Sequence, residues 1–343
     1  MYKESDLYIT SNDFASFANV IYSDRQGFDN NLFDNETEVI EFSNNPQFKH
    51  MTYKKLKFTI KSNDVIFCNT NQLDNLFFHL RRISKINDLT LITHQTDQLI
   101  TQRIYKKKPK CIKKWFSVNV GFEENDLIPI PIGIASEFSK KNLIINDFSK
   151  FELNNFKKDE VSLYLNFQKN TNYFERNKIY KIFEDKSWAK FDSPNLQKRE
   201  YLEKISSSAF VLCPWGNGVD THRVWESLYA GSIPVTKKHP TFKLFDSLPI
   251  LFVDDYVDIT YNLLSSYLNN LQLDNYNFDL LTKSYWRKLI ENRNISSNNV
   301  KTIEEKFYIS LYFKTKKKIL NIVKTFLKKI NSYLFRLINK LGL

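Results

Sequence analysis

The sequence predicts an α/β protein of two halves of similar size, followed by a basic helix. From about residue 55 onward, short apolar runs alternate with amphipathic stretches, a pattern typical of parallel strands joined by helices. The 343 residues exceed the length of one ordinary domain and suit two of about 150 residues each. Hydrophobic residues make up 42% of the chain and aromatic residues 15%, which is enough to build buried cores and excludes a disordered chain.

The first half, residues 1–150, is expected to contain a parallel sheet. Its pattern predicts, in order, a strand over 64–70, a helix over 72–83, a strand over 89–93, a loop over 94–97 and strands over 110–120 and 127–134. A polar stretch without a clear period, residues 140–160, is interpreted as the connection between the halves.

The second half, residues 151–300, repeats the alternation. Its pattern predicts strands over 161–167, 209–214, 232–236 and 250–255, and helices over 173–185, 196–207 and 221–230. After Asp258 the pattern becomes helical, and these helices are expected to pack back on the first half. The best architecture is two α/β halves with a crevice between them.

The last segment, residues 301–343, is expected to be a helical tail whose basic amphipathic part covers residues 311–343. That part contains nine Lys or Arg residues and no acid. Apolar residues recur there at helical spacing: Ile319, Val323, Phe326, Leu327, Ile330, Leu334, Leu337, Ile338 and Leu341. Such a helix binds anionic membrane surfaces, where each cation contributes about 1 kcal/mol. The alternative is a helix packed on the body with its lysines in solvent.

Charge and cysteine content limit the classes of partner and location. The net charge is +12, and because nine positive charges belong to the tail, residues 1–310 share only +3. A nucleic-acid partner is therefore not expected. Cys68, Cys111 and Cys213 lie far apart without a CxxC spacing, and we interpret them as reduced and buried. The N-terminal residues lack the apolar core of a signal peptide, so a cytoplasmic location is expected.

The stretch from Leu212 to Val235 contains three of the seven glycines. An apolar strand is followed there by Gly216 and Gly218, and then by Asp220 or Thr221 as the N-cap of a helix. A strand, a glycine-rich turn and a helix N-terminus together form an anion site, because backbone N–H groups point toward the ligand.

Arg223 and Glu226 lie on one face of that helix, three residues apart. A cation in the first turn opposes the helix dipole unless an anion binds beside it. The guanidinium suits phosphate oxygens, and the carboxylate can accept hydrogen bonds from ribose hydroxyls. The spacing alone is equally consistent with an ordinary surface ion pair.

The stretch "FVLCPWGNGVDTHRVWESLYAGSIPV" resembles the donor-site motif of exostosin-like glycosyltransferases. The similarity extends over roughly residues 89–260, through "LITHQTD", "KKWFSVN", "IPIPIGI", "YLNFQKNTNYFERNKIY", "LQKREYLEKISSSAF" and "LPILFVDDYVDIT". The resemblance implies a GT-B arrangement, with two Rossmann-like domains facing a cleft, the nucleotide-sugar bound by the second and the acceptor by the first. It also implies inverting, metal-independent transfer. Asp254 and Asp255 lack the spacing of a metal pair, and no metal and no cofactor are expected.

Site residues follow from matching this sequence to the motif. Arg223 is expected to neutralise the departing diphosphate and Glu226 to hold the ribose, with Arg176 as a second diphosphate cation. The remaining donor-site residues are expected to line the phosphates, shape the loop or line the cleft: Thr221, Gly216, Gly218, Asn217, Asp220, Asn166 and Asn172. Arg176 as a solvated helix arginine is the alternative. Trp215 stands where the motif is often basic, and an aromatic ring there could stack on the base.

Inversion needs a general base for the acceptor hydroxyl, and it should come from the first half. Asp97 and His94 follow the strand over 89–93 directly and are the candidates. His222 lies beside Arg223, but adjacent helix residues diverge by about 100°, so we expect it to pack under the loop.

The sequence thus predicts a hexosyltransferase-type glycosyltransferase on the inner face of the membrane. It would move a sugar from a nucleoside diphosphate sugar to a glycan or lipid-linked acceptor in surface polysaccharide synthesis. A fucosyltransferase-like enzyme with a guanosine diphosphate donor is one alternative. A non-catalytic nucleotide- or glycan-binding scaffold at the membrane is the other.

Overall fold

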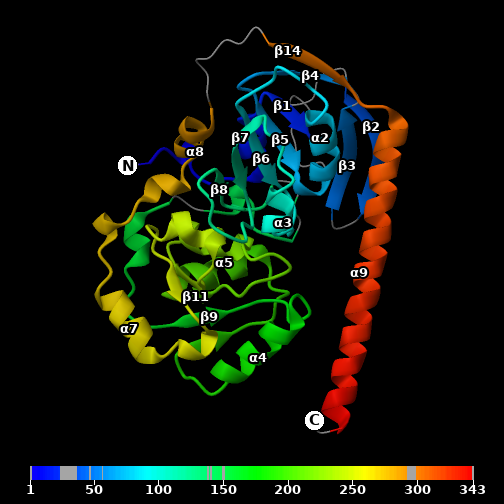
Figure 1. The fold of residues 1–343 in the computed structure, drawn as a ribbon. Coiled ribbons are helices and arrows are strands. Elements are labelled where there is room, and N and C mark those ends of the chain that lie inside the picture. Colours follow the sequence, from blue (N-terminus) through cyan, green and yellow to red (C-terminus); the bar gives the residue numbers. More distant parts are fainter. Residues whose placement is uncertain are drawn as a thin grey trace.

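The computed structural model of the chain describes residues 2–23, 37–45, 48–55, 57–136, 139, 141–148, 151–291 and 299–341. These ranges form a mixed α/β protein in which each half contains one five-stranded parallel sheet (Figure 1). The predicted α/β class with parallel sheets is therefore confirmed. Lys150, at the expected end of the first half, lies outside the described residues.

The first sheet has the strand order β1-β5-β6-β7-β8, and every described pairing in it is parallel. Its strands are β1 Val20–Tyr22, β5 Val65–Asn69, β6 Leu89–His94, β7 Ile112–Ser117 and β8 Leu127–Pro129. All residues of β5 and β6 are buried, as their continuous apolar runs predict. The short edge strand β1 was not predicted.

Two antiparallel pairs accompany the first sheet, and neither was predicted. A hairpin is formed by β2 Thr37–Asn45 and β3 Phe48–Lys55. The second pair joins β4 Lys57–Lys61 to β14 Val300–Glu304. Through β14 the chain returns to the first half. Because β14 covers the first residues of the segment 301–343, which was expected to be helical throughout, that expectation is wrong for its start, and the long helix begins only at Phe307.

The second sheet has the strand order β10-β9-β11-β12-β13, again with parallel pairings. Its strands are β9 Leu163–Leu165, β10 Ala189–Phe191, β11 Phe210–Leu212, β12 Ile233–Lys237 and β13 Leu251–Val253. The chain runs from β9 to the edge strand β10 and then crosses back to β11. This reversal makes a topological switch point between β9 and β11, and ligands of open α/β sheets bind outside the carboxyl ends of the strands at such points.

Helices connect the strands and cover the sheets. The α-helices are α1 Ser11–Ser16, α2 Leu73–Leu80, α3 Gln102–Tyr105, α4 Tyr173–Phe183, α5 Lys198–Ser207, α6 His222–Tyr229, α7 Tyr261–Asn269, α8 Lys283–Ile290 and α9 Phe307–Leu341. Short 3-10 helices are η1 Glu4–Asp6, η3 Thr70–Gln72, η4 Ile145–Asp147, η5 Leu153–Phe156, η6 Pro240–Phe245, η7 Tyr256–Asp258, η8 Leu273–Asn275 and η9 Phe278–Leu281.

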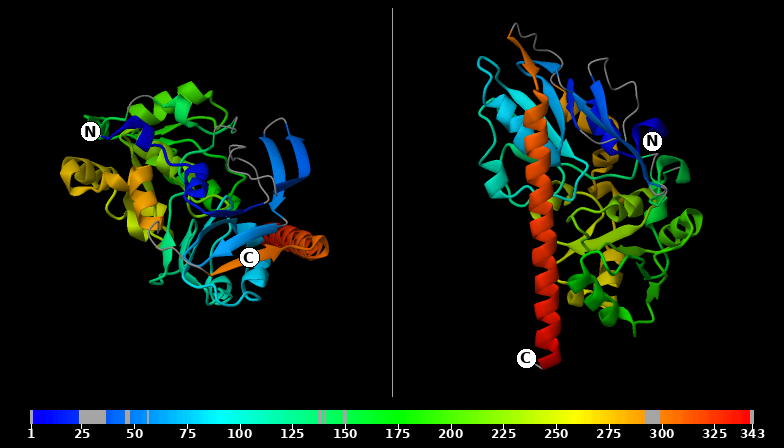
Figure 2. Two further views of the ribbon diagram at one scale, coloured as in Figure 1. Left: turned by 90° about the horizontal axis from the view of Figure 1, so that it is seen from above. Right: turned by 90° about the vertical axis from the view of Figure 1, so that its right-hand side faces the viewer.

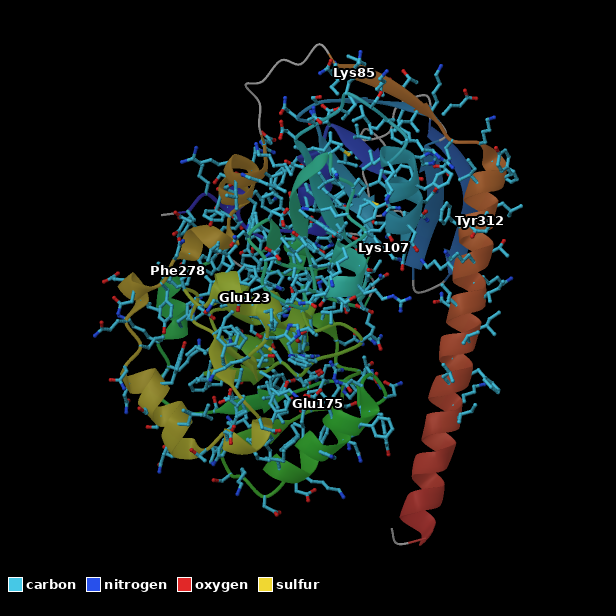
Figure 3. All side chains as sticks on the ribbon, viewed as in Figure 1. Lys85, Lys107, Glu123, Glu175, Phe278 and Tyr312 are labelled. Atoms are coloured by element: carbon cyan, nitrogen blue, oxygen red, sulfur yellow. The ribbon has the colours of Figure 1, made fainter. Side chains whose placement is uncertain are left out.

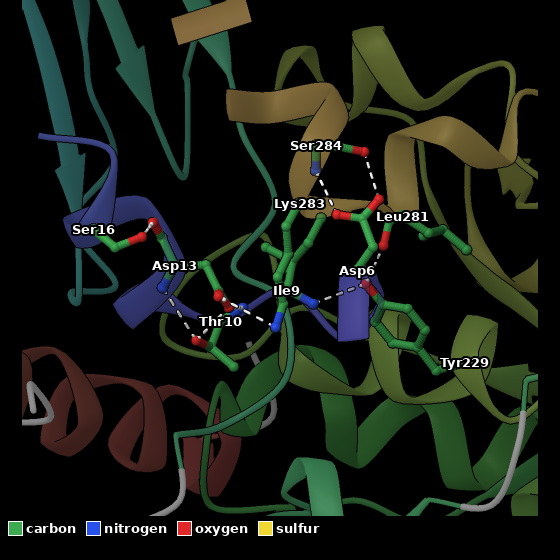
Figure 4. A network of polar contacts seen from close by, with 9 residues as sticks. All are labelled: Asp6, Ile9, Thr10, Asp13, Ser16, Tyr229, Leu281, Lys283 and Ser284. Atoms are coloured by element: carbon green, nitrogen blue, oxygen red, sulfur yellow. Dashed lines mark hydrogen bonds and ion pairs between the residues drawn. The ribbon is translucent and has the colours of Figure 1, made fainter. Parts of the chain in front are cut away.

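The late helix α8 packs against α1 and the N-terminal segment. Lys283 lies 3.3 Å from the Asp13 carboxylate, and the Ser284 amide donates to Asp6 at 2.9 Å. The hydroxyl of Tyr229, from α6, accepts from the Ile9 amide and donates to the carbonyl of Leu281, at the end of η9 just before α8 (Figure 4). The expectation that late helices pack back on the first half is confirmed.

The helix α9 has 35 residues and runs beside both halves (Figures 1 and 2). Its start is anchored, because the Glu305 carboxylate is 2% exposed and accepts a hydrogen bond from Asn75, and the ring of Phe313 contacts that of Phe78. Further along, Ile319 is 56% exposed and Phe326 63% exposed. These exposed residues of α9 are therefore not covered by the body. Tyr312, near the start of the helix, is labelled in Figure 3. Side chains beyond residue 330 lie outside the description.

In the described ranges, no helix combines the length and hydropathy that crossing a bilayer requires.

Candidate functional site

The carboxyl ends of the two parallel sheets face each other. Asn119 follows β7, and its side-chain oxygen accepts the backbone N–H of Asp220 at 2.9 Å. The Ile132 amide, beyond β8, donates to the Asp220 carboxylate at 2.7 Å. His222, at the start of α6, donates from Nδ1 to the Gly133 carbonyl at 2.7 Å. The segment from Pro214 to Thr221, here called the Gly loop, thus lies where the two sheet edges meet.

The guanidinium of Arg176 holds the Gly loop in place. Its Nε donates to the Trp215 carbonyl at 2.8 Å, and one terminal nitrogen donates to the Pro214 carbonyl at 2.9 Å. The other terminal nitrogen donates to Gln168, beyond β9, at 3.0 Å. Burial, and then the nearby charge of Arg223, lower the pKa of Arg176 to about 10. Each nitrogen of this predicted phosphate ligand is therefore bonded to a backbone carbonyl at the switch point.

The two glycines of the loop lie close to side chains from outside the loop. A Cβ at Gly216 would lie 3.3 Å from the Arg176 guanidinium. A Cβ at Gly218 would lie 2.9 Å from the side-chain nitrogen of Asn119, closer than real Cβ atoms approach. Gly218 therefore makes room for the first half of the chain.

Two residues at the N-terminus of α6, Thr221 and Arg223, each have one buried polar atom without a partner among the described residues. Thr221 is the N-cap residue, yet its hydroxyl does not cap the helix. Its Oγ1 and the Nε of Arg223 are both buried and have no hydrogen-bond partner among the described residues. Leaving a buried donor unpaired costs about 1–3 kcal/mol. Since native structures rarely keep such groups, these two atoms mark a position where a polar ligand is expected.

Glu226 lies beneath this position and is only 4% exposed. Its carboxylate accepts a hydrogen bond from Tyr201, on α5, at 3.1 Å. Burial works to lower the pKa of the Arg223 guanidinium, but Tyr201, Cys213 and Glu226 offset it, and the pKa of Arg223 is raised. Arg223 therefore keeps its positive charge although it is partly buried. The role of Tyr201 was missed, because its position in α5 follows the ordinary helical period.

Asp220 is 2% exposed and lies inside the contact between the halves. Both carboxylate oxygens accept from Trp225 Nε1, at 2.9 and 3.1 Å. Burial raises the pKa of Asp220 to about 7, although the hydrogen bonds from Ile132 and Trp225 oppose the shift. This side chain joins α6 to the first half.

The three asparagine candidates lie in different surroundings. Asn166, directly after β9, is 5% exposed and donates to the Ser193 carbonyl at 2.9 Å. Asn172 has a left-handed φ of 57° before α4 and donates to Glu175, which Figure 3 labels. Asn217 is exposed at the tip of the Gly loop. In the described ranges, no three His, Cys, Asp or Glu side chains gather as a metal site would require.

His94 and Asp97, the candidate bases, have opposite surroundings. His94 is 1% exposed; its Nε2 bonds the Pro131 carbonyl at 3.2 Å, and its Nδ1 accepts the Gln95 amide at 2.7 Å. Asp97 is exposed on the loop after β6. The preceding carbonyl, that of Thr96, accepts from Asn119 at 3.4 Å, so the loop bearing Asp97 lies near the Gly loop.

The burial of His94 has a consequence for stability. Burial lowers the pKa of His94 from 6.5 to about 3, so below pH 6.5 the unfolded chain binds a proton that the folded chain does not. The folded state therefore loses stability as pH falls. Between pH 6.5 and 4.5, wild-type protein should lose about 2 kcal/mol of unfolding free energy relative to His94→Gln. Urea unfolding of both proteins at each pH measures this difference. A difference that does not vary with pH would contradict the buried neutral imidazole.

The fold and this site together define an α/β protein with two parallel sheets and a polar loop between their carboxyl edges. No protein-family model matches the sequence, and no curated protein matches it. A solved structure with partial similarity is AviGT4, a glycosyltransferase involved in avilamycin A biosynthesis. It is 11% identical, with a TM-score of 0.29, and the match covers 66% of this chain and 78% of that one. Similarity at that level supports no conclusion about activity, and the exostosin-like resemblance stays a prediction.

Proposed function

We propose that the chain is a glycosyltransferase that moves a sugar from a nucleoside diphosphate sugar to a glycan or lipid-linked acceptor. The observation that carries the proposal is the pair of buried, unpartnered polar atoms at the N-terminus of α6, Arg223 Nε and Thr221 Oγ1. They lie beside the switch point of the second sheet, where α/β folds bind ligands. The motif resemblance of the same stretch supports the same assignment.

A diphosphate suits this position on electrostatic grounds. The N-terminus of α6 has no acidic residue in its first turn, so its dipole favours an anion. Arg223 supplies a positive charge that stabilises the departing diphosphate. In this proposal Arg176 acts through the loop carbonyls it bonds, and Glu226 acts by holding the Tyr201 hydroxyl beside Arg223.

The transfer proposed is inverting. The acceptor oxygen forms a bond to the anomeric carbon as the bond from that carbon to the phosphate oxygen breaks, and the nucleoside diphosphate leaves with the electron pair. A base takes the proton of the acceptor hydroxyl. We assign this role to Asp97, because both ring nitrogens of His94 are already bonded within the protein. Arg223 and the helix N-terminus balance the charge of the leaving group.

The proposed location is the inner face of a membrane, with α9 as the contact. The exposed apolar face and the lysines of α9 support this assignment, because interfacial helices combine both. A fucosyltransferase-like enzyme with a guanosine diphosphate donor, or a non-catalytic scaffold at the membrane, would use the same surfaces.

Incubation with uridine- and guanosine-diphosphate sugars, an acceptor extract and a nucleotide-release assay tests the proposal. Nucleotide release that depends on the acceptor is expected. The donor that is consumed shows whether the enzyme recognises the uridine or the guanosine nucleotide. Saturable binding without turnover would favour the scaffold, and absence of both binding and turnover would overturn the proposal.

A further inference from the structure

The Gly loop receives its shape from the first half of the chain as well as from its own. On the side of the second sheet, Arg176 bonds the carbonyls of Pro214 and Trp215. On the side of the first sheet, Asn119 and Ile132 bond Asp220. The short turn between these two sets of hydrogen bonds contains Gly216, whose amide donates to the Gly218 carbonyl at 2.9 Å.

Asn119 is fixed in the conformation that this contact needs. It is fully buried and has a left-handed φ of 55°, which among L residues asparagine tolerates best. Its side-chain oxygen accepts from Asp220 and its side-chain nitrogen donates to Thr96. The same nitrogen occupies the space that a Cβ at Gly218 would need. Asn119 and Gly218 are therefore matched in shape.

Asp220 transmits this contact to the helix. Its carboxylate accepts hydrogen bonds from the Ile132 amide in the first half and from Trp225 in α6, two residues beyond Arg223. Because Asp220 is almost fully buried between the halves, it does not present its oxygens to solvent at the ligand position. Its contacts set where the N-terminus of α6 lies.

We propose that Asn119 and Asp220 are positioning residues, through which the first half of the chain holds the Gly loop and the N-terminus of α6 in the shape that binds the donor diphosphate. This inference rests on the proposed function and adds to it a dependence of the second half on the first. Removing the hydrogen bond between Asn119 and Asp220 should weaken diphosphate binding although Arg223 and Thr221 are unchanged.

Asn119→Gly is the variant of choice, because glycine accepts a positive φ and only the amide group is lost. Affinity for uridine and guanosine diphosphates, measured by calorimetry on the full chain, should fall about 3- to 10-fold, the scale of one lost hydrogen bond. Asn63→Gly is the matched control, since Asn63 also has a positive φ, of 71°, and lies in the turn before β5. It should bind as wild type does.

A second variant separates positioning from direct contact. Gly218→Ala should weaken binding in the wild-type background by displacing the Asn119 amide, and should add little in the Asn119→Gly background, where the displaced group is absent. Hydrogen exchange of the peptide that contains Asp220 should accelerate in Asn119→Gly, because the Asp220 amide loses its acceptor. Affinities are compared at a temperature where thermal melts show each variant folded.

Three results would overturn the inference. Unchanged affinity in Asn119→Gly would show that the loop does not need the first half. An equal loss from Gly218→Ala in both backgrounds would place Gly218 against the ligand itself. If wild type binds neither diphosphate, the proposed function fails and the inference with it; loss in Arg223→Ala without loss in Asn119→Gly rejects the inference alone.

Discussion

Replacing Arg223 by alanine is expected to weaken nucleoside diphosphate binding by about 1.5–3 kcal/mol, or roughly 10- to 150-fold, the worth of a charged hydrogen bond. The reason lies in the surroundings of the side chain. Its Nε is buried without a partner, its charge is maintained by Tyr201 and Glu226, and it lies in the first turn of α6. Because the Arg223 Nε is desolvated without a hydrogen-bond partner, a bound anion would supply an acceptor and so contribute strongly to the binding free energy.

The matched control is Arg199→Ala. Arg199 is also a helix arginine with an acid further along the same helix, but it is exposed on α5 and pairs with Glu203, four residues later, at 3.0 Å. Exposed pairs of this kind contribute little, about 0.3–0.5 kcal/mol. Isothermal calorimetry with uridine and guanosine diphosphates compares the two variants. Arg223→Lys should recover part of the affinity, since lysine restores charge without the planar fork. Equal affinity of wild type and Arg223→Ala would reject the donor site.

Phe326→Asp should lower the binding of the chain to anionic vesicles by about tenfold or more. Phe326 is 63% exposed on α9, in line with Ile319, Val323 and Ile330 on the same face. Burying a phenylalanine in the bilayer interface contributes about 1.5–3 kcal/mol, and the new carboxylate also meets the negative surface. Because the side chain is exposed in the folded chain, the thermal midpoint should stay the same.

Asn321→Asp provides the control for this substitution. It adds the same charge to α9 about 140° around the helix from Phe326, on the face where the lysines gather. Vesicle sedimentation at low and high salt then separates two contributions to binding, the insertion of apolar side chains into the bilayer and the attraction of the lysines to the anionic surface. Salt screens only the electrostatic attraction. A lower thermal midpoint in Phe326→Asp would indicate that α9 packs on the body. Unchanged sedimentation would reject membrane contact through this face.

Much of the fold could be predicted from local pattern. The runs at 161–167, 209–214 and 232–236 became β9, β11 and β12, because a continuous apolar segment has few alternatives to a buried parallel strand. Weak or distant pairings were missed. β1 and β10 are edge strands of their sheets, and the pairing of β14 with β4 joins residues more than 230 positions apart. The hydrophobic periodicity of a segment indicates which of its residues are buried, but not which other segment of the chain packs against them.

By itself the sequence determined the α/β class, the helix that begins after Thr221, and the concentration of positive charge in the tail. These depend on neighbours within a few residues, whose spacing the chain states directly. Only the tertiary structure decided that Arg176 bonds loop carbonyls, that Gly218 makes room for Asn119, and that Glu226 accepts a hydrogen bond from Tyr201. Each of these contacts joins residues at least 25 positions apart in the chain, so its geometry exists only in the folded protein, and the contact of Gly218 with Asn119 also requires the carboxyl edges of the two sheets to meet.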